Sequence, residues 1–534
     1  MIDIERVRLK NGELELHISV FTPPDDINAQ TRPITIFRHA VPQEEEYNWI
    51  MAKEGAPCHP ILRNQNNKPV TKQEWTFNKR FGKTERVRLD KFRVQEILHR
   101  VCADPVKHNK VFGLSEPTVK KFCDIETGPR KDEYGNILKG FSSAEEASGE
   151  VLCMTICDQL GNVDIMSCYN MPTSQRARYV HDLEKHFEKH KKKFNVTYKF
   201  YNTENQMLAD FFYCIMPHIS FISGWNFLKY DWLYLVNRAK RLSIDYTRCA
   251  VNGTFQTLSL TDKWDKTKKT LIPVPFHKAV VDYLLIYEKW DMSIKLKTNN
   301  SLDAVSGELF GVSKQKYEGT LNDYWERDKY GYILYNAIDT ILVSMIDERL
   351  GTFKTMIALA SEGMVPLNDS MFASNMVSML SYGYYIKKNI VFTNNSSEKE
   401  EKDGKNDESY TGGYVRQPLA GIFNMVMVMD YESLFPSLMS AFNTGIEVYL
   451  GKTIKNGSLC VAGDIFVDDD GKQHVLNLED HIWTAFGVVY NRKEESVMRL
   501  VVNKLLNNRV YNKNEGTQVE NEILELKRML AVIN

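Results

Sequence analysis

The sequence has no apolar run long enough to cross a membrane and no excess of charge of either sign. No stretch reaches the roughly 18 apolar residues that a membrane helix needs, and the first 20 residues alternate apolar and charged positions, unlike a secretory signal. We therefore expect a soluble cytoplasmic protein with no membrane partner. Lysine plus arginine number 68 and aspartate plus glutamate 69. This balance gives no sign of nucleic-acid binding, although local basic strips can bind DNA in a neutral protein.

The sequence also lacks the cysteine patterns of metal and disulfide sites. Its nine cysteines include no C-x-x-C pair, and the closest two are Cys153 and Cys157. We expect them to be reduced and mostly buried. What is present is length: 534 residues predict roughly three or four modules. A composition of 43% hydrophobic and 26% charged residues excludes wholesale disorder and fibrous architecture.

The order of apolar and polar residues predicts an α/β region in the first two thirds of the chain. Residues 1 to about 115 contain short strand-like runs that are separated by aromatic-rich turns. Between 120 and 350, strand-like runs at 151–157 and 278–287 alternate with helical patterns such as 206–217. The fold class is therefore α/β and multidomain.

The last third of the chain contains a polar linker and several helical patterns. Residues 393–409 have almost no apolar side chains to offset the entropy of ordering, which predicts a mobile loop. The apolar segment 423–442 is predicted to be a strand that leads into a helix. Residues 495–514 and 518–534 have helical periodicity, and the turn signal N-E-G between them predicts two helices.

The segment F-C-D-I-E-T places two carboxylates on one face of a predicted strand. Asp124 and Glu126 are two residues apart, so both side chains project in the same direction. Such oxygens are the ligands that Mg²⁺ or Mn²⁺ prefers, and two ions about 4 Å apart can hydrolyse a phosphodiester. A solvated surface strand is the alternative explanation of this pair.

Two later segments offer further candidate ligands. Asp231 lies near the start of a helical pattern that follows Gly-Trp-Asn, where a carboxylate is ordinarily a helix cap. Tyr335 and Asp339 are four residues apart on a predicted helix, which places the phenol and the carboxylate on one face. Taken alone, that face is more typical of a helix core.

Taken together, these segments resemble the D-x-E, N-x-x-x-Y-D and Y-x-x-x-D motifs of the DEDDy exonucleases. Their order and spacing are most similar to family B DNA polymerases of T-even-like bacteriophages. The resemblance implies a 3′-5′ exonuclease with two Mg²⁺ or Mn²⁺ ions. It implies metal ligation by Asp124, Glu126, Asp231 and Asp339, water positioning by Tyr335, and contact of Asn226 with the substrate strand.

The lysine-rich segment 253–276 reads as a β-hairpin with two interpretations. It is either an exposed hairpin kept soluble by charge or, by resemblance, one that helps to part the primer end from the template.

The segment D-Y-E-S-L-F-P-S resembles motif A of the same polymerases. Asp430 is predicted to leave a buried strand beside a strand-to-helix turn, where a carboxylate suits a metal-bound triphosphate. The resemblance implies nucleotide contacts for Ser433, Leu434 and Phe435. Phe435 stands where tyrosine is usual, so the ring that excludes a 2′-hydroxyl is kept and its phenolic hydroxyl is lost.

Other segments resemble further polymerase motifs. Tyr410, Gly412 and Gly413 match a Y-x-G-G motif and would approach the template strand, because glycine removes the Cβ barrier; a plain glycine turn is the alternative. Arg509 and Lys513 lie four apart on a helix and could bind a triphosphate, although a solvated basic face would look the same. Lys527 matches the lysine of motif B imperfectly.

The resemblance implies an RNase H-like exonuclease domain with an amino-terminal domain and partial palm and fingers. Its expected ranges are residues 1–119 with 352–390 for the amino-terminal domain, 120–351 for the exonuclease, 391–490 for the palm and 491–534 for the fingers. Helices at 352–362 and 370–386 are expected.

The sequence contains no D-T-D-S turn, the motif C that supplies the second palm carboxylate, and no thumb. We therefore expect the amino-terminal part of a split or truncated replicative polymerase of a phage-infected bacterial cell. Its expected partners are primer-template DNA, a single-stranded 3′ end, deoxynucleoside triphosphates, a second fragment with motif C and thumb, and a sliding clamp bound through that fragment. The alternatives are a stand-alone exonuclease with a polymerase remnant and an RNA-binding role of the amino-terminal region.

Overall fold

The computed structural model describes most of residues 1–534. The residues outside the description are 23–33, 54, 56, 66, 79–82, 114–115, 118, 133, 141, 262–266, 291–298, 313, 316, 394–415, 418, 432, 455–458 and 534. The predicted linker at 393–409 lies almost entirely outside the described residues. Among the described helices, none has both the length and the apolarity that a membrane crossing needs.

The chain divides into two compact units, each described here by itself. The first comprises residues 1–43 and 101–376, and the second comprises 44–100 and 377–534. The four domain ranges expected from the sequence stay a prediction.

The first unit is built around a six-stranded sheet. The strand order is β12-β11-β10-β9-β13-β16, in which β9, β10 and β11 are antiparallel and the remaining pairings are parallel. This arrangement is consistent with the expected RNase H-like exonuclease sheet. The strands are β9 (Lys121–Thr127), β10 (Val151–Asp158), β11 (Asn162–Ser167), β12 (Asn195–Phe200), β13 (Phe221–Ser223) and β16 (Ala279–Val280).

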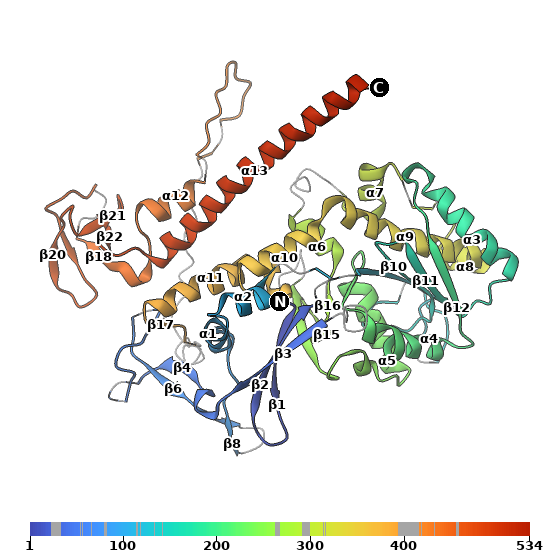
Figure 1. Ribbon diagram of the computed structural model, residues 1–534, viewed down its shortest axis with the longest axis horizontal. Coiled ribbons are helices and arrows are strands. Elements are labelled where there is room, and N and C mark those ends of the chain that lie inside the picture. The colour runs from blue at the N-terminus through green and yellow to red at the C-terminus, as the bar shows by residue number, and fades with distance from the viewer. Residues whose placement is uncertain are drawn as a thin grey trace. The chain divides into compact units, whose positions relative to one another are not determined.

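Helices cover the sheet. The long helix α9 (Lys329–Leu350) packs against β9 and β10 (Figure 1). Asp328 caps it by accepting a hydrogen bond from Gly331 N at 2.9 Å. The other helices of this unit are α2 (Pro105–Phe112), α3 (Thr173–His186), α4 (Glu204–Asp210), α5 (Leu233–Arg241), α6 (Tyr283–Trp290), α7 (Leu302–Phe310), α8 (Leu321–Arg327) and α10 (Thr352–Glu362).

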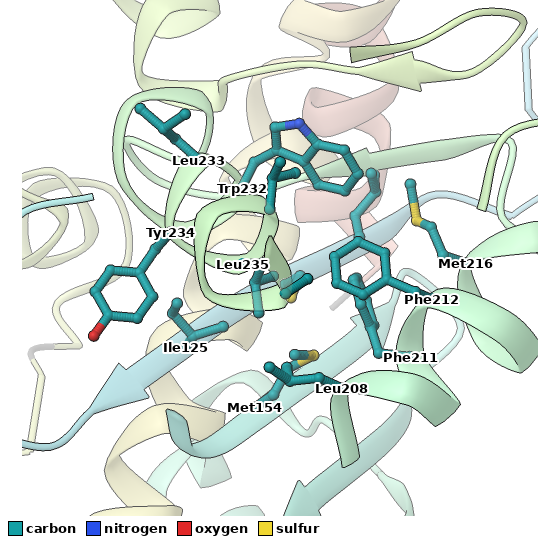
Figure 2. Packing of buried hydrophobic residues seen from close by; sticks show 14 of the residues in the cluster. Ile125, Met154, Leu208, Phe211, Phe212, Met216, Trp232, Leu233, Tyr234 and Leu235 are labelled. Atoms are coloured by element: carbon teal, nitrogen blue, oxygen red, sulfur yellow. The ribbon is translucent and has the colours of Figure 1, made fainter. Parts of the chain in front are cut away.

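An apolar core fills the side of the sheet that carries Ile125. It combines strand residues such as Ile125 and Met154 with two π-helical turns, Phe211–Ile215 and Leu228–Trp232. Figure 2 shows Phe212 and Trp232 within this core, and their ring centroids are 6.3 Å apart. Burial of these large side chains fixes the turn that carries Asp231.

The first unit also contains a small amino-terminal sheet and a hairpin. β1 (Asp3–Arg8), β2 (Leu14–Phe21) and β3 (Ile34–Val41) form an antiparallel sheet. β14 (Phe255–Thr261) and β15 (Lys269–Pro275) pair as the predicted hairpin. The strand-like runs expected near the amino terminus and the hairpin are confirmed, while the role of the hairpin stays a prediction.

The described residues of the second unit form several short sheets and four α-helices. Two hairpin-like pairs join β4 (Asn48–Met51) to β6 (Val70–Gln73) and β7 (Trp75–Asn78) to β8 (Lys83–Arg86), and β5 (Arg63–Asn64) pairs with β17 (Ile390–Val391). A five-stranded sheet has the order β20-β19-β18-β22-β21, with β18 (Tyr449–Thr453), β19 (Ile465–Val467), β20 (Gln473–Val475), β21 (His481–Trp483) and β22 (Val488–Asn491). The helices that contribute all or most of their residues to this unit are α1 (Lys91–Val101), α11 (Ala373–Lys387), α12 (Leu434–Ala441) and α13 (Val497–Ile533).

Three predicted elements differ from the structure. The run at 278–287 is only a two-residue strand followed by α6, because Asp282 caps a helix that begins at Tyr283 by accepting hydrogen bonds from the N–H groups of Leu284 and Leu285. Residues 424–430 form no strand, and no described strand pairs with them. A strand needs such a partner for its backbone hydrogen bonds.

The tail is one helix instead of two. α13 continues through the N-E-G segment without a break. A single glycine costs a helix only about 1 kcal/mol relative to alanine, which the helical residues on both sides can offset. The expected helices at 352–362 and 370–386 correspond to α10 and α11.

Candidate active site

Strand β9 presents Asp124 and Glu126 on one face and Ile125 on the other. Ile125 enters the apolar core, and the two carboxylates face α9. The alternation predicted from the sequence is therefore confirmed.

Helix α9 supplies the groups that meet these carboxylates. Asn336 Nδ2 donates to Asp124 Oδ2 at 2.7 Å, and Tyr332 OH donates to Glu126 Oε2 at 3.2 Å. Sequence reasoning missed both residues. Their spacing of four on a helix, beside Tyr335 and Asp339, is the signal that could have identified them.

Asp339 completes a cluster of three carboxylates with Asp124 and Glu126. One oxygen from each lies within 4.8 Å of the others, although Asp339 lies more than 200 positions after the two acids of β9. Asp339 is 3% exposed, and its Oδ1 is buried without a hydrogen-bond partner among the described residues. Tyr335, one turn before Asp339 on the same helix, is also buried.

Asp231 contacts β9 on the side where β13 pairs with it. β13 pairs with β9 only at Lys121 and Phe122, so the backbone of β9 is unpaired beyond that point on this side. Asp231 Oδ1 accepts a hydrogen bond from Ile125 N at 3.1 Å. Asp231 therefore lies beside the strand segment that carries the other two acids, although it is not part of the group within 4.8 Å.

The turn before Asp231 depends on a glycine. A Cβ at Gly224 would lie 2.3 Å from Cys123 O, so only glycine allows the chain to pass this close to β9. Asn226 follows with a φ of 61° and an exposed side chain, and its carbonyl oxygen accepts from Tyr230 N at 3.0 Å. Asn226 therefore lies on the accessible side of the turn.

A lysine lies among the carboxylates. The Lys314 ammonium group forms an ion pair with Asp339 Oδ2 and donates to Tyr335 OH at 3.3 Å. Its backbone N–H donates to Asp303 Oδ1 at 2.7 Å, which holds the loop between α7 and α8 in place. Sequence reasoning missed Lys314, because nothing local distinguishes it from other surface lysines.

Burial and mutual repulsion raise the pKa of the acids. Burial, followed by the charge of Asp339, raises the pKa of Asp124 to about 7. Burial also raises the pKa of Glu126 and Asp231 well above their ordinary values, and the charge of Asp124 adds to both shifts. The pKa of Asp339 is raised by burial and lowered in part by Lys314. Among the described residues, Lys314 is the cation that lowers the pKa of Asp124, Glu126 and Asp339, and burial still raises all three.

This donor set fits hard divalent cations. Mg²⁺ and Mn²⁺ prefer carboxylate oxygens, and the cluster offers several of them, including the unpartnered Oδ1 of Asp339. A cation would supply the positive charge that the acids lack. Among the residues that the structure describes, this group contains no cysteine or histidine ligand of the kind that zinc favours.

The residues resembling polymerase motif A lie in the second unit. Ser433 has a φ of 53° and precedes α12, and Arg509 Nη1 of α13 donates to its Oγ at 2.8 Å. The structure thus brings these two predicted nucleotide-binding residues together. Lys513 lies one turn further along α13 and is exposed.

Other predicted polymerase residues are exposed or outside the description. Asp430 is exposed, so the prediction that it ends a buried strand is wrong; the segment before it has no partner strand among the described residues. Leu434 is 42% exposed and Phe435 is 73% exposed. The side chain of Lys527 and all of Tyr410, Gly412 and Gly413 lie outside the described residues.

Two models of known protein families match this chain, one in the region of the acids of β9 and one in the region of motif A. The model of the DNA polymerase family B exonuclease domain matches residues 124–305, and that of DNA polymerase family B matches residues 374–530. The DNA-directed DNA polymerase of Escherichia phage RB69 is 24% identical over 43% of this chain and 24% of its own length. That of Enterobacteria phage T4 is 22% identical over 48% of this chain and 28% of its own length. The matches thus span about a quarter of each of these curated relatives.

A cellular relative shows a similar extent of likeness. The DNA polymerase delta catalytic subunit of Schizosaccharomyces pombe is 24% identical over 41% of this chain and 20% of its own length.

Proposed function

Because the chain belongs to DNA polymerase family B, we propose that the acids of β9 and α9 form a 3′-5′ exonuclease site that removes the terminal nucleotide of a DNA strand. The observation that carries this proposal is that Asp339 of α9, more than 200 positions further along the chain, lies within 4.8 Å of Asp124 and Glu126 of β9. The match of the exonuclease family model to residues 124–305 supports it.

We assign metal ligation to the four acids. Asp124, Glu126, Asp231 and Asp339 would hold two Mg²⁺ or Mn²⁺ ions. When bound, such ions activate water and stabilise the leaving oxygen of a phosphodiester. Attack of water on the phosphodiester requires neutralisation of negative charge more than a general acid. The proposed mechanism therefore needs no catalytic histidine.

Tyr335 of α9 and Lys314 of the loop between α7 and α8 would act on the reacting groups from beside Asp339. Burial raises the pKa of the Tyr335 phenol, so this group stays protonated at neutral pH and can orient the attacking water by hydrogen bonding. The charges of Asp339, Asp124 and Glu126 raise the pKa of Lys314 despite its burial. Its ammonium group would offset the negative charge that develops on the phosphate. Asn226, exposed beside Asp231, would contact the substrate strand.

We propose that this exonuclease proofreads for a DNA-directed DNA polymerase. The family match at residues 374–530 and the contact between Arg509 and Ser433 support nucleotide binding in the second unit. Asp430 would be a metal ligand, while Leu434, Phe435, Lys513 and Lys527 would contact the deoxynucleoside triphosphate. Tyr410, Gly412 and Gly413 would contact primer-template DNA.

Polymerisation requires a second palm carboxylate, which the 534 residues do not offer as a D-T-D-S turn. We propose that a second fragment outside these 534 residues, in this polypeptide or in another, supplies this motif C and the thumb, and that a sliding clamp binds through it. The phage relatives support action in the cytoplasm of an infected bacterial cell.

Digestion of a 5′-labelled single strand tests the exonuclease directly. The wild-type chain is expected to shorten the strand from its 3′ end with Mg²⁺ and to stop when the metal is chelated. The double variant Asp124→Asn with Glu126→Gln is expected to lose at least about 10³-fold in rate, because both central ligands lose their charge. Glu188→Gln, which neutralises an exposed acid elsewhere in the same unit, is the matched control.

Unchanged digestion by the double variant would refute the site. Incorporation of nucleotides on primer-template DNA, with and without a candidate second fragment, separates the remaining possibilities. Incorporation by the chain alone would refute the need for a second fragment. Digestion without any incorporation in either mixture would identify a stand-alone exonuclease.

A further inference from the structure

A second group of potential metal ligands combines two residues of the amino-terminal sheet with one from the segment before β16. Glu5 on β1 and His17 on β2 are directly opposite each other in the antiparallel pairing. His277 lies between β15 and β16. One ligand atom from each of the three residues lies within 4.8 Å of the others, and the residues are 6%, 5% and 0% exposed.

The hydrogen bonds of this group leave imidazole nitrogens unused. His277 Nε2 lies 2.8 Å from Glu5 Oε2, and His17 Nε2 lies 2.8 Å from Glu15 Oε2. The Nδ1 atoms of His17 and His277 are both buried and have no hydrogen-bond partner among the described residues. Buried polar atoms are ordinarily satisfied, so the open Nδ1 of His17, on the residue paired with Glu5, requires an explanation.

The backbone also favours a specific role for His277. Its φ of 65° lies in the left-handed region, which a residue with a Cβ rarely adopts. Such strained residues concentrate at ligand-binding sites. Asn252 Nδ2 donates to Glu5 Oε2 at 3.1 Å and fixes the carboxylate toward the two rings.

We propose that Glu5, His17 and His277 bind one zinc ion. Zinc takes imidazole nitrogen and carboxylate oxygen at about 2.0–2.1 Å, which places two ligands of a tetrahedral ion about 3.3 Å apart. The 2.8 Å between His277 Nε2 and Glu5 Oε2 requires only a small adjustment for an ion to replace the shared proton.

Glu15 gives the proposed site its second layer. Histidines that bind metals usually donate their other ring N–H to a carboxylate, which fixes the ring and raises its basicity. Glu15 Oε2 takes this position at His17 Nε2 and leaves His17 Nδ1 as the ligand atom. The acids of β9, which offer only oxygens, suit a different class of cation.

The ion would have a structural role. It would join β1 and β2 of the amino-terminal sheet to the segment that immediately precedes β16, the edge strand of the six-stranded sheet. Binding of zinc at this place does not depend on the proposed exonuclease or polymerase activity. The proposal therefore stands or fails separately from the proposed function.

The zinc content of the chain purified without a polyhistidine tag tests this inference. After dialysis into buffer with Mg²⁺, the wild-type chain is expected to retain one zinc per chain. The exonuclease variant Asp124→Asn with Glu126→Gln is expected to retain the same amount, while His17→Gln and His277→Gln retain less than a tenth of it. His181→Gln, which removes an exposed imidazole from α3, is the matched control.

A second variant keeps the test valid if the buried histidine variants do not fold. Glu15→Gln leaves all three ligands in place and is expected to weaken zinc binding about 10- to 100-fold. In the zinc-free wild-type chain, one equivalent of Co²⁺ should produce the visible absorption bands of tetrahedral cobalt. A wild-type chain that retains no zinc and gives no such bands would overturn the proposal, as would equal zinc affinity in Glu15→Gln.

Discussion

Lys314 and Lys192 form ion pairs whose contributions to stability differ, because the carboxylate partner is buried in one pair and exposed in the other. Both side chains are 29% exposed, and each forms an ion pair with a carboxylate. The partner of Lys314 is Asp339, whose side chain is 4% exposed, whereas Glu348, the partner of Lys192, is 56% exposed. Loss of one member of a buried pair leaves an uncompensated charge, but exposed pairs contribute little.

Lys314→Ala is therefore expected to lower exonuclease activity and stability together. We expect a 10²- to 10³-fold slower release of the 3′ nucleotide, comparable to loss of one electrostatic group in an active site. The melting temperature in chelator should also fall, because Asp339 then remains buried beside Asp124 without its cation. Single-turnover digestion and thermal unfolding measure the two effects. Lys192→Ala should change neither, and equal behaviour of the two variants would contradict the role of Lys314.

Only some of the residues of the candidate site could be predicted from the sequence. The acids were predicted because their motifs combine carboxylates with a strand or helix period. Lys314, Tyr332 and Asn336 were missed because their contacts with Asp339, Glu126 and Asp124 depend on how α9 and the loop between α7 and α8 pack around β9.

At the scale of elements, Asp282 ties two elements together. Its Oδ1 accepts from Leu284 N and Leu285 N at the start of α6, and its Oδ2 accepts from Leu228 N at the π-helical turn that carries Asp231. Burial raises the pKa of this carboxyl to about 6, against the opposing effect of the three N–H donors.

The raised pKa predicts a specific pH dependence of stability. An acid with a higher pKa in the folded state binds its proton more tightly when folded, so its contribution is present below the unfolded pKa of about 3.9 and is lost as the pH rises through about 6. Between pH 4.5 and 7, the free energy of unfolding should therefore fall more steeply in the wild-type chain than in Asp282→Asn, by at most about 1.4 kcal/mol per pH unit. Thermal unfolding of both chains across this range measures the difference, and parallel curves would contradict it.

Elements with a clear period were predicted well, and elements decided by neighbours were not. The strand of Asp124 and the helix of Asp339 follow from alternation and helical spacing. The segment 424–430 has the apolar residues of a strand, but Met425, Met427 and Met429 are 101%, 81% and 86% exposed. Propensity alone cannot supply the partner strand that such a segment needs.

At the scale of the whole molecule, the chain contains two compact units with different relations to the sequence motifs. In the first, motifs from three distant segments meet beside one strand. In the second, Ser433 and Arg509 meet, while Asp430 is exposed and has no described acid beside it in a metal-binding group. The first unit therefore has the more complete candidate site among the described residues.

The exonuclease site is tested most directly by counting the Mn²⁺ ions that the chain binds with and without its two central acids. Electron paramagnetic resonance of the chain, titrated with Mn²⁺ in the presence of a short single strand of DNA with a non-hydrolysable 3′ linkage, counts the bound ions. We predict that the wild-type chain binds two more ions than the double variant Asp124→Asn with Glu126→Gln. This difference removes any contribution from sites elsewhere in the chain. Equal numbers of bound ions in the two proteins would contradict the account.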